Sequence, residues 1–318
     1  MDMTRLAPSP TGALHLGNAR TFLVNWLLAR RFGWRIQLRI EDLDGPRIRP
    51  GSDQLLIEDL RFLGLDWDDG PIYQSSRTAE YQIAIDSLLR QGLAYACVCS
   101  RREVDLAASA PHAEDGSAIY PGTCRGRFAS ADEATRQSGR APAIRFAAPD
   151  EPIEFEDGFA GRQILNVARR LGDFVIAKSD GVAAYQLAVV VDDLSAGITD
   201  VVRGDDLLES TFRQILLYHA LGARDRIPSY IHLPLVVGAD GRRLAKRHGD
   251  TRLAMYRELG VGRWQLLTLL ANWCGIPVKS EKIDDPRQLI DRFDLRTISR
   301  SPVVFKPEDD VWLRRGTA

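Results

Sequence analysis

Long apolar runs, a secretion signal and a strong excess of one charge are all missing from this chain of 318 residues. No apolar run reaches the roughly 18 residues that a membrane-spanning helix needs, so we expect no contact with a membrane. The first ten residues, MDMTRLAPSP, lack the basic-then-apolar order of a signal peptide. We therefore expect a cytoplasmic protein. No segment is repeated, and no long linker divides the chain.

The formal net charge is only −1, so the chain as a whole gives no sign of a polyanionic partner. The charge is unevenly distributed, however. From Gly241 to Ala318 there are sixteen Lys and Arg against ten Asp and Glu, a difference of +6, which leaves −7 for the remainder. A basic tail of this kind can contact a nucleic acid or form a solvated helical surface, and charge alone leaves both interpretations open.

Only four cysteines are present, and Cys97, Cys99 and Cys124 lie near one another in the sequence. In a chain without a secretion signal, such a cluster favours a metal over a disulfide framework. Structural Zn²⁺ takes four ligands, and by spacing His112 is the candidate for the fourth. The alternative is three reduced, buried thiols. Cys274 stands alone in an apolar segment and is expected in the core.

Alternating strand and helix signals predict an α/β fold with a parallel sheet. Ligands of such sheets bind at the carboxyl ends of the strands. The predicted strands are 4–7, 35–44, 183–193 (buried) and 231–238, and a strand and a helix share 198–222, with the helix capped near Asp206. The other predicted helices are 18–33, 51–67 (capped by Ser52 or Asp53), 263–275 and 285–293.

A polar, cysteine-containing stretch interrupts this rhythm between residues 95 and 180. We predict that it is inserted between the two halves of one sheet domain, which are residues 1–94 and 181–249. Residues 250–318 are predicted to form a short helical region.

Two basic loops are candidates for a nucleotide site: RLAPSPTGALHLGN at 5–18 and RRLAKRH at 242–248. His15 lies where the first loop becomes a helix, and helix N-termini hold phosphates through their free N–H groups. Gly17 allows the nucleotide to approach closely. Lys246 lies on the second loop, which could close on a leaving pyrophosphate. Each loop alone is better explained as an ordinary turn, with a surface histidine in the first and solvated charges in the second; only the pair predicts an ATP site.

Five blocks together resemble the class I aminoacyl-tRNA synthetases of the glutamyl/glutaminyl subgroup. They read RLAPSPTGALHLGNART, RIEDLD, VVVDD, VVRGDDLLESTFRQI and HLPLVVGADGRRLAKRHG. The resemblance implies a Rossmann-like parallel sheet with an inserted zinc-containing subdomain and a short helical C-terminal region that contacts a tRNA stem. It also implies L-glutamate, ATP with Mg²⁺ and a tRNA as substrates, with no obligate protein partner. Asn18 and Ala245 differ from the residues that are commonest in the two signature motifs.

The same resemblance implies site residues. The amino-acid site would comprise Arg5, Leu6, Ala7, Pro8, Ser9, Glu41, Tyr185 and Arg203, and the ATP site His15, Gly17, Asn18 and Lys246, of which His15 and Lys246 would be catalytic. Two arginines suit a carboxylate, so glutamate is favoured over glutamine. The fourth zinc ligand would be Tyr120 rather than His112. Simpler roles stay open: a salt bridge of Glu41 with Arg39 or Arg47, a core position for Tyr185 on its strand, and an ion pair of Arg203 with Asp205 or Asp206.

A glutamyl-tRNA synthetase continues well past its second motif into an anticodon-binding domain, whereas only residues 249–318 follow here. The combination resembles a paralogue in the subgroup that activates glutamate with ATP and transfers it to the queuosine base in the anticodon of tRNA-Asp. Three rivals stay open: a truncated synthetase that charges tRNA-Glu, a non-catalytic relic that holds tRNA or ATP, and a different nucleotidylyltransferase.

Overall fold

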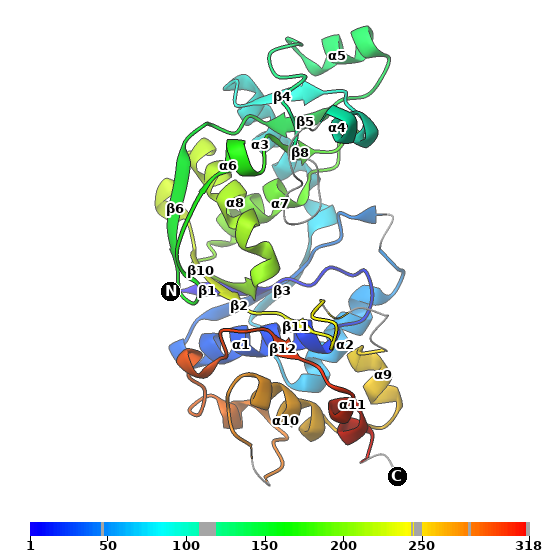
Figure 1. Cartoon of the computed structure of the whole chain (residues 1–318), viewed down its shortest axis with the longest axis vertical. Coiled ribbons are helices and arrows are strands. Elements are labelled where there is room, and N and C mark those ends of the chain that lie inside the picture. Colours follow the sequence, from blue (N-terminus) through cyan, green and yellow to red (C-terminus); the bar gives the residue numbers. More distant parts are fainter. Residues whose placement is uncertain (46–47, 108–118, 243, 245–249, 279–280, 316–318) are drawn as a thin grey trace.

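The predicted parallel sheet is present and is built from two ladders. The computed structural model describes residues 1–45, 48–107, 119–242, 244, 250–278 and 281–315 (Figure 1). The first ladder is fully parallel and has the order β1 (Met3–Leu6), β2 (Arg35–Ile40), β3 (Asp69–Tyr73). Helices α1 (Leu16–Phe32) and α2 (Ser52–Leu63) connect these strands, as the 3.6-residue apolar period predicts.

The second ladder continues from the first at β1. Thr199, just before β9 (Asp200–Gly204), donates its backbone N–H to the carbonyl of Met3 at 2.9 Å. From β9 the order runs through β10 (Ser229–Leu233) and β6 (Pro152–Asp157), both parallel to their neighbour, to the antiparallel β7 (Gly161–Asn166). Helix α8 (Leu208–Ala220) makes the crossover between β9 and β10. The α/β class with a parallel sheet is therefore confirmed.

The predicted buried strand at 183–193 is wrong, because this segment forms helix α7 (Tyr185–Ala196). The run is apolar on every side, so its periodicity could not separate a buried helix from a buried strand. The helix ends at Gly197, whose φ of 70° places it in the left-handed region that closes many helices. Asp192 and Asp193 thereby turn inward, each only 3% exposed.

Three boundaries also differ from the predictions. The N-cap of α2 is Gly51, without a side-chain hydrogen bond, so neither Ser52 nor Asp53 caps it. The strand predicted at 231–238 is divided into the end of β10 and β11 (Val236–Val237). The break falls at Pro234, because proline has no N–H to donate to the ladder. The helix predicted at 285–293 is only the short 3₁₀ turn Pro286–Leu289.

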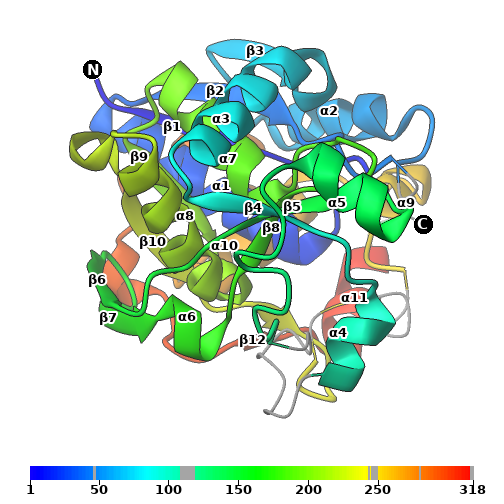
Figure 2. The same ribbon diagram turned by 90° about the horizontal axis from the view of Figure 1, so that it is seen from above.

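A second, antiparallel sheet lies at the far end of the molecule from the C-terminal helices (Figure 1). Its order is β4 (Ala94–Cys97), β5 (Ala143–Phe146), β8 (Phe174–Ala177). Near it lie helices α3 (Thr78–Arg90), α4 (Arg101–Ala107), α5 (Ala131–Ser138) and α6 (Val167–Arg170). The β6–β7 hairpin and helices α4 and α5 lie on opposite sides in the view from above (Figure 2). The hairpin falls within the range predicted as an insertion, yet β6 pairs with β10 of the main sheet.

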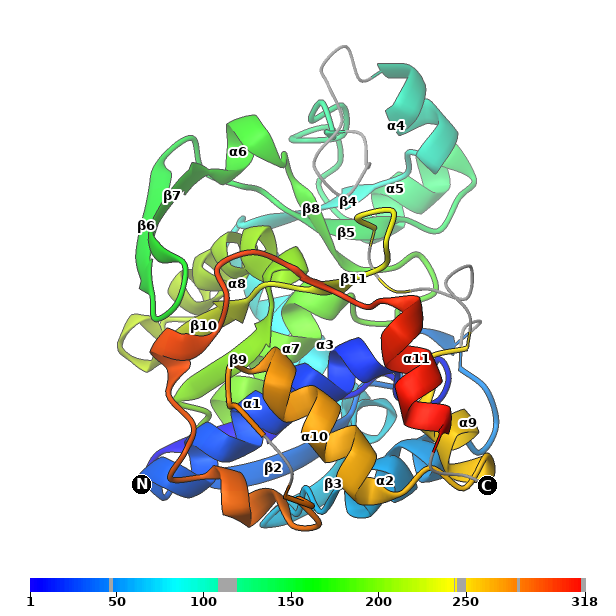
Figure 3. The ribbon, with the colours of Figure 1, turned by 60° about the horizontal axis from the view of Figure 1, so that its bottom comes forward.

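The C-terminal part packs on the α1 side of the β1–β2–β3 sheet (Figure 3). It comprises α9 (Leu253–Glu258), α10 (Arg263–Trp273), the strand β12 (Val303–Val304) beside β11, and α11 (Pro307–Arg314). Trp26, Leu27, Leu266 and Leu270 are fully buried in one core that both parts share. Among the described residues, no helix is long and apolar enough to cross a membrane.

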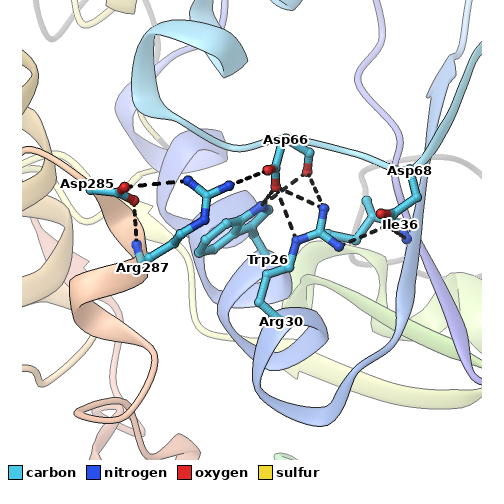
Figure 4. A network of polar contacts seen from close by, with 7 residues as sticks. All are labelled: Trp26, Arg30, Ile36, Asp66, Asp68, Asp285 and Arg287. Atoms are coloured by element: carbon cyan, nitrogen blue, oxygen red, sulfur yellow. Dashed lines mark hydrogen bonds and ion pairs between the residues drawn. The ribbon is translucent and has the colours of Figure 1, made fainter.

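Polar contacts reinforce this junction. In the network of Figure 4, Arg287 pairs with Asp66 at 2.6 Å, and Asp66 also accepts a hydrogen bond from the indole of Trp26 at 2.8 Å. Deeper in the junction, the fully buried Arg20 donates to the carbonyls of Pro234 at 2.6 Å and Trp273 at 3.1 Å. One guanidinium therefore joins α1, the β10–β11 turn and α10.

Candidate functional site

The loop that carries His15 is bonded to the segment that follows the basic loop. Leu16 donates its backbone N–H to the carbonyl of Thr251 at 3.0 Å, and Leu253 donates to the carbonyl of Leu14 at 2.7 Å. The first signature loop therefore lies beside residues 251–253, which follow the second signature loop in the sequence. Lys246 and Ala245 lie outside the described residues, so the position of the predicted lysine stays a prediction.

His15 is the N-cap residue of α1. Its backbone is extended, and its Nδ1 accepts the N–H of Asn18 at 3.4 Å, which leaves the ring proton on Nε2. Gly17 fits tightly beside it: a Cβ at this position would lie 3.3 Å from the imidazole and 3.5 Å from the Cβ of Val236 on β11. The site therefore combines a helix N-terminus, an imidazole N–H and a close backbone approach, which together suit a phosphate group.

The predicted amino-acid site gathers at the carboxyl ends of β1 and β2. Glu41 donates its backbone N–H to the carbonyl of Pro8 at 3.0 Å, which ties the segment 5–9 to the end of β2. The Arg5 side chain is 6% exposed, and its Nε lies 3.7 Å from the carboxylate of Asp193 but has no hydrogen-bond acceptor within the described chain. Burial lowers the pKa of Arg5, and Asp193 opposes this effect.

Glu41 takes part in the salt bridge that was the simpler alternative. Arg39 lies 3.2 Å from its carboxylate and 2.5 Å from that of Asp193. Burial raises the pKa of Glu41, while the positive charges of Arg39 and Arg5 counteract the rise. Glu41 still belongs to the site despite this salt bridge, because its negative charge also raises the pKa of Tyr185.

Tyr185 opens helix α7 and is half-buried. Burial raises the pKa of its phenol, and the charges with the largest further effects on this pKa are those of Arg203, Glu41 and Arg5. The structure thus brings four of the eight predicted contacts of the amino acid to one place. They are Arg5 on β1, Glu41 just after β2, Tyr185 at the start of α7 and Arg203 on β9. The core position on a strand is wrong, because Tyr185 faces these charges from the first turn of a helix.

Arg203, at 5% exposure, is held by neutral groups. Its Nε donates to Nε2 of His232 at 2.9 Å, and its Nη2 donates to Thr211 at 2.7 Å and Gln214 at 2.9 Å. Its Nη1 is buried and has no acceptor in the part of the chain that the structure describes. Within that part, Arg203 pairs with neither Asp205 nor Asp206, so the ion-pair alternative is not supported.

Sequence reasoning did not assign the residues that support this site. They are Arg39, Asp157, Asp193, Thr211, Gln214 and His232. Two signals were available: Asp193 ends the apolar run VVVDD, and His232 interrupts the apolar strand IHLPL. Neither signal identifies a partner, because each partner comes from a distant strand or helix.

The four predicted metal ligands converge at the end of β4. The Sγ atoms of Cys97, Cys99 and Cys124 all lie within 4.8 Å of one another. The hydroxyl of Tyr120, a residue only 5% exposed, lies 3.4 Å from Sγ of Cys97 and 3.7 Å from Sγ of Cys99. Three thiols and a phenol at this spacing fit a tetrahedral Zn²⁺. His112 lies outside the described residues.

Arg145 on β5 adds a positive charge to this cluster. Its Nε donates to Sγ of Cys97 at 3.3 Å, and its guanidinium lies 3.9 Å from the centre of the Tyr120 ring. A cation at these distances would offset part of the negative charge that thiolate and phenolate ligands bring to a metal site.

Comparison with known proteins adds three findings. A family model described as the catalytic domain of class I tRNA synthetases (E and Q) matches residues 3–310. The chain is 48% identical, over 99% of both chains, to a protein of Symbiobacterium thermophilum named Glutamyl-Q tRNA(Asp) synthetase. A protein of Rhodopirellula baltica with the same name is 46% identical over 94% of this chain and 95% of the relative. Among solved structures, a glutamate tRNA ligase from Elizabethkingia meningosepticum in complex with its amino acid matches this chain with a TM-score of 0.81 at 30% identity. The match covers 98% of this chain and 68% of the ligase chain.

Proposed function

Because this chain belongs to the class I glutamyl and glutaminyl tRNA synthetases, we propose that it transfers glutamate to the queuosine base in the anticodon of tRNA-Asp. Members of this family are ligases that use ATP, an amino acid and a tRNA. The observation that supports the finer substrate is the identity, along nearly the whole of both chains, to relatives with that printed name.

The buried arginine pair supports glutamate as the amino acid. Nε of Arg5 and Nη1 of Arg203 are buried donors without acceptors in the described chain. A carboxylate offers only acceptors, whereas the amide of glutamine would turn an N–H toward one of these cations. Glu41 supplies the opposite charge for the α-ammonium group, and Tyr185 offers a hydroxyl. Segment 5–9, including Leu6, Ala7, Pro8 and Ser9, would form the wall of this pocket.

In the activation step, an oxygen of the glutamate α-carboxylate attacks the α-phosphorus of ATP, whose Mg²⁺ neutralises phosphate charge. The bond from that phosphorus to the bridging oxygen breaks, and pyrophosphate leaves with the electron pair. His15, the backbone at Gly17 and the N-terminus of α1 stabilise the charge at the reacting phosphate, and Asn18 orients His15 through the N–H that it donates to Nδ1. Lys246 is proposed to pair with the leaving pyrophosphate.

In the transfer step, a hydroxyl of the queuosine ring attacks the carbonyl carbon of the glutamyl adenylate. An ester bond forms, AMP leaves, and the hydroxyl proton is released. No covalent intermediate with the enzyme is required, so these residues bind and orient the two substrates.

We also propose a division of labour along the chain. Residues 1–94 and 181–249 would form the catalytic domain, 95–180 a zinc-containing insertion, and 250–318 the region that contacts the tRNA. In the insertion, Cys97, Cys99, Tyr120 and Cys124 would hold Zn²⁺ and so fix the segment 120–124 to the end of β4.

The test has two stages. Amino-acid-dependent exchange of pyrophosphate into ATP, measured without tRNA for each amino acid, should require glutamate. Labelled glutamate should then transfer to tRNA-Asp that carries queuosine and not to the same tRNA without it. A second candidate, charging of tRNA-Glu, is favoured by the likeness to the solved ligase. Equal acceptance by unmodified tRNA-Glu would establish that candidate instead, and absence of exchange would indicate a non-catalytic relic.

A further inference from the structure

A buried chain of three polar side chains runs behind the amino-acid site. Oδ2 of Asp157 lies 2.6 Å from Nδ1 of His232, and Nε2 of His232 lies 2.9 Å from Nε of Arg203. The three residues are 2%, 1% and 5% exposed. Their strands lie side by side, because β10 pairs with β6 at Tyr230 and Asp157 and with β9 at His232 and Arg203.

The residues at the two ends of this row, Asp157 and Arg203, determine which nitrogen of His232 carries the proton. A carboxylate only accepts, so Nδ1 of His232 must carry a proton to bond with Asp157. Arg203 only donates, so Nε2 must be bare to accept from it. The hydroxyl of Thr211, 3.1 Å from Nε2, can donate to the same atom. Burial lowers the pKa of His232 to about 4, which keeps the ring neutral in this tautomer at neutral pH.

Asp157 is fixed by its own turn. Its Oδ1 accepts the backbone N–H groups of Phe159 at 2.9 Å, Ala160 at 2.7 Å and His232 at 3.2 Å. Only Oδ2 is therefore left for the imidazole. The β6–β7 hairpin thus supplies one acceptor of fixed direction to the ring on β10.

Arg203 has five N–H groups, and the protein accounts for three of them. His232 takes the one on Nε, and Thr211 and Gln214 take those on Nη2. The two on Nη1 have no acceptor in the described chain. The orientation of the guanidinium plane is therefore set by His232 on one side and by α8 on the other.

We propose that Asp157 and His232 are positioning residues, which hold Arg203 so that Nη1 serves a carboxylate of the amino-acid substrate. The proposal rests on the proposed function, since the substrate it names is glutamate. Asp157 acts through the tautomer of His232, and His232 acts through the direction of the Nε–H bond of Arg203. Neither residue touches the reacting atoms.

The sharpest test is Asp157→Asn. The three N–H groups at Oδ1 keep the amide oxygen there, so the amide nitrogen replaces Oδ2 and donates to Nδ1. The ring proton then moves to Nε2 and opposes the N–H of Arg203. In pyrophosphate exchange, we expect the KM for glutamate to rise about tenfold or more, as for a lost charge-assisted hydrogen bond, with the KM for ATP unchanged. The matched control is Asp150→Asn, at an exposed carboxylate that pairs with Arg169, which should leave both constants unchanged.

Two substitutions at His232 separate positioning from packing. His232→Gln can place its amide oxygen near the former Nε2 and should keep most of the affinity for glutamate. His232→Leu fills the space without an acceptor and should raise the KM for glutamate as Asp157→Asn does. If both substitutions, or neither, alter this constant, or if the KM for ATP rises equally, the two residues have only a structural role.

A readout independent of catalysis completes the test. The chain has only five histidines, so the ¹⁵N resonances of its imidazoles can be assigned by substitution. We expect one buried ring with its proton on Nδ1 in the wild type and on Nε2 in Asp157→Asn. A wild type without glutamate-dependent exchange would overturn the proposed function, whereas an unchanged tautomer would overturn the positioning chain alone.

Discussion

Gly17 lies against the ring of His15 so closely that a Cβ at this position would be 3.3 Å from both Nδ1 and Cε1. Such a contact is tighter than side chains normally accept, and the Cβ of Val236 at 3.5 Å limits movement on the other side. The direction of the imidazole therefore depends on the absence of a side chain at residue 17.

Gly17→Ala should accordingly displace the imidazole and slow activation. We expect the rate of pyrophosphate exchange to fall by about ten- to a hundredfold, since small displacements of catalytic groups have effects of this size. Gly45→Ala is the matched control, because a Cβ there meets nothing within 4 Å and the backbone does not need glycine. Equal rates for the two variants would show that His15 does not depend on this contact.

Glu41→Gln should separate activity from stability. The substitution removes the charge proposed to bind the α-ammonium group, so we expect the KM for glutamate to rise about ten- to a hundredfold. Burial raises the pKa of Glu41, which means that its charge is costly in the fold. Arg39 keeps Asp193 at 2.5 Å, so the free energy of unfolding in urea should change by less than about 1 kcal/mol.

The comparison variant is Asp193→Asn, which removes the close partner of the fully buried Arg39. This change should destabilise the fold by about 3 kcal/mol or more, because the buried Arg39 loses its closest carboxylate and the buried Arg5 loses the carboxylate at 3.7 Å. A larger loss of stability in Glu41→Gln than in Asp193→Asn would contradict this ranking.

His232 should make the fold sensitive to mild acid. Its pKa is 6.5 in the unfolded chain and about 4 in the folded one, because burial and the charge of Arg203 outweigh the attraction of Asp157. Above pH 6.5 both states are neutral and the full stability is present. As the pH falls from 6.5 to 4, His232 binds a proton in the unfolded chain but not in the folded chain. The free energy of unfolding therefore falls by up to ~3 kcal/mol.

Urea unfolding of the wild type and of His232→Gln across this pH range measures the effect. The variant should show a smaller fall in the free energy of unfolding between pH 6.5 and pH 4. Parallel curves for the two proteins would mean that His232 is not kept neutral by the fold.

The metal centre should hold about one Zn²⁺ per chain, bound by three thiolates and the phenolate of Tyr120. Tyr120→Phe keeps the thiolates and removes one donor, so a competing chelator should extract zinc at about tenfold lower concentration or less. Cys274→Ala is the control: this thiol is buried near Arg20, away from the cluster, and its loss should leave the zinc content unchanged. Wild-type protein without zinc would favour three structural thiols.

The sequence allowed good predictions where local pattern and tertiary packing agree. Helix α1 was predicted from its apolar period and the stop at Gly33, which has a φ of 73°. Helix α7 was mistaken for a strand because it is buried on most of its surface, where it packs against α3, α8 and β8. The periodicity that predicts a helix requires one polar face exposed to solvent, so it cannot identify a helix that is buried on most of its surface.

The supporting residues of the site were not predictable for a related reason. Arg203 meets His232 only because β9 and β10 pair in one register, and Asp157 reaches His232 only because β6 adds to the same sheet. A shift of register by one residue would turn each of these side chains to the opposite face. The types of residue were visible in the sequence, but their pairing depends on sheet order.

The junction between α1 and the C-terminal part allows a final prediction, since a buried and an exposed arginine both hold it. Arg20 is fully buried and satisfies the carbonyls of Pro234 and Trp273. Arg287 pairs with Asp66 and Asp285 at the surface, with its side chain 57% exposed (Figure 4).

Arg20→Met should lower the free energy of unfolding by about 2–4 kcal/mol, because it leaves two buried carbonyls without donors. Arg287→Met should lower it by less than about 1 kcal/mol, since water screens the pair and solvates both carboxylates. Because the carbonyl of Pro234 lies two residues before β11, which contacts Gly17, Arg20→Met should also slow pyrophosphate exchange. If Arg287→Met proved the more destabilising change, the surface network and not the buried guanidinium would hold the two parts together.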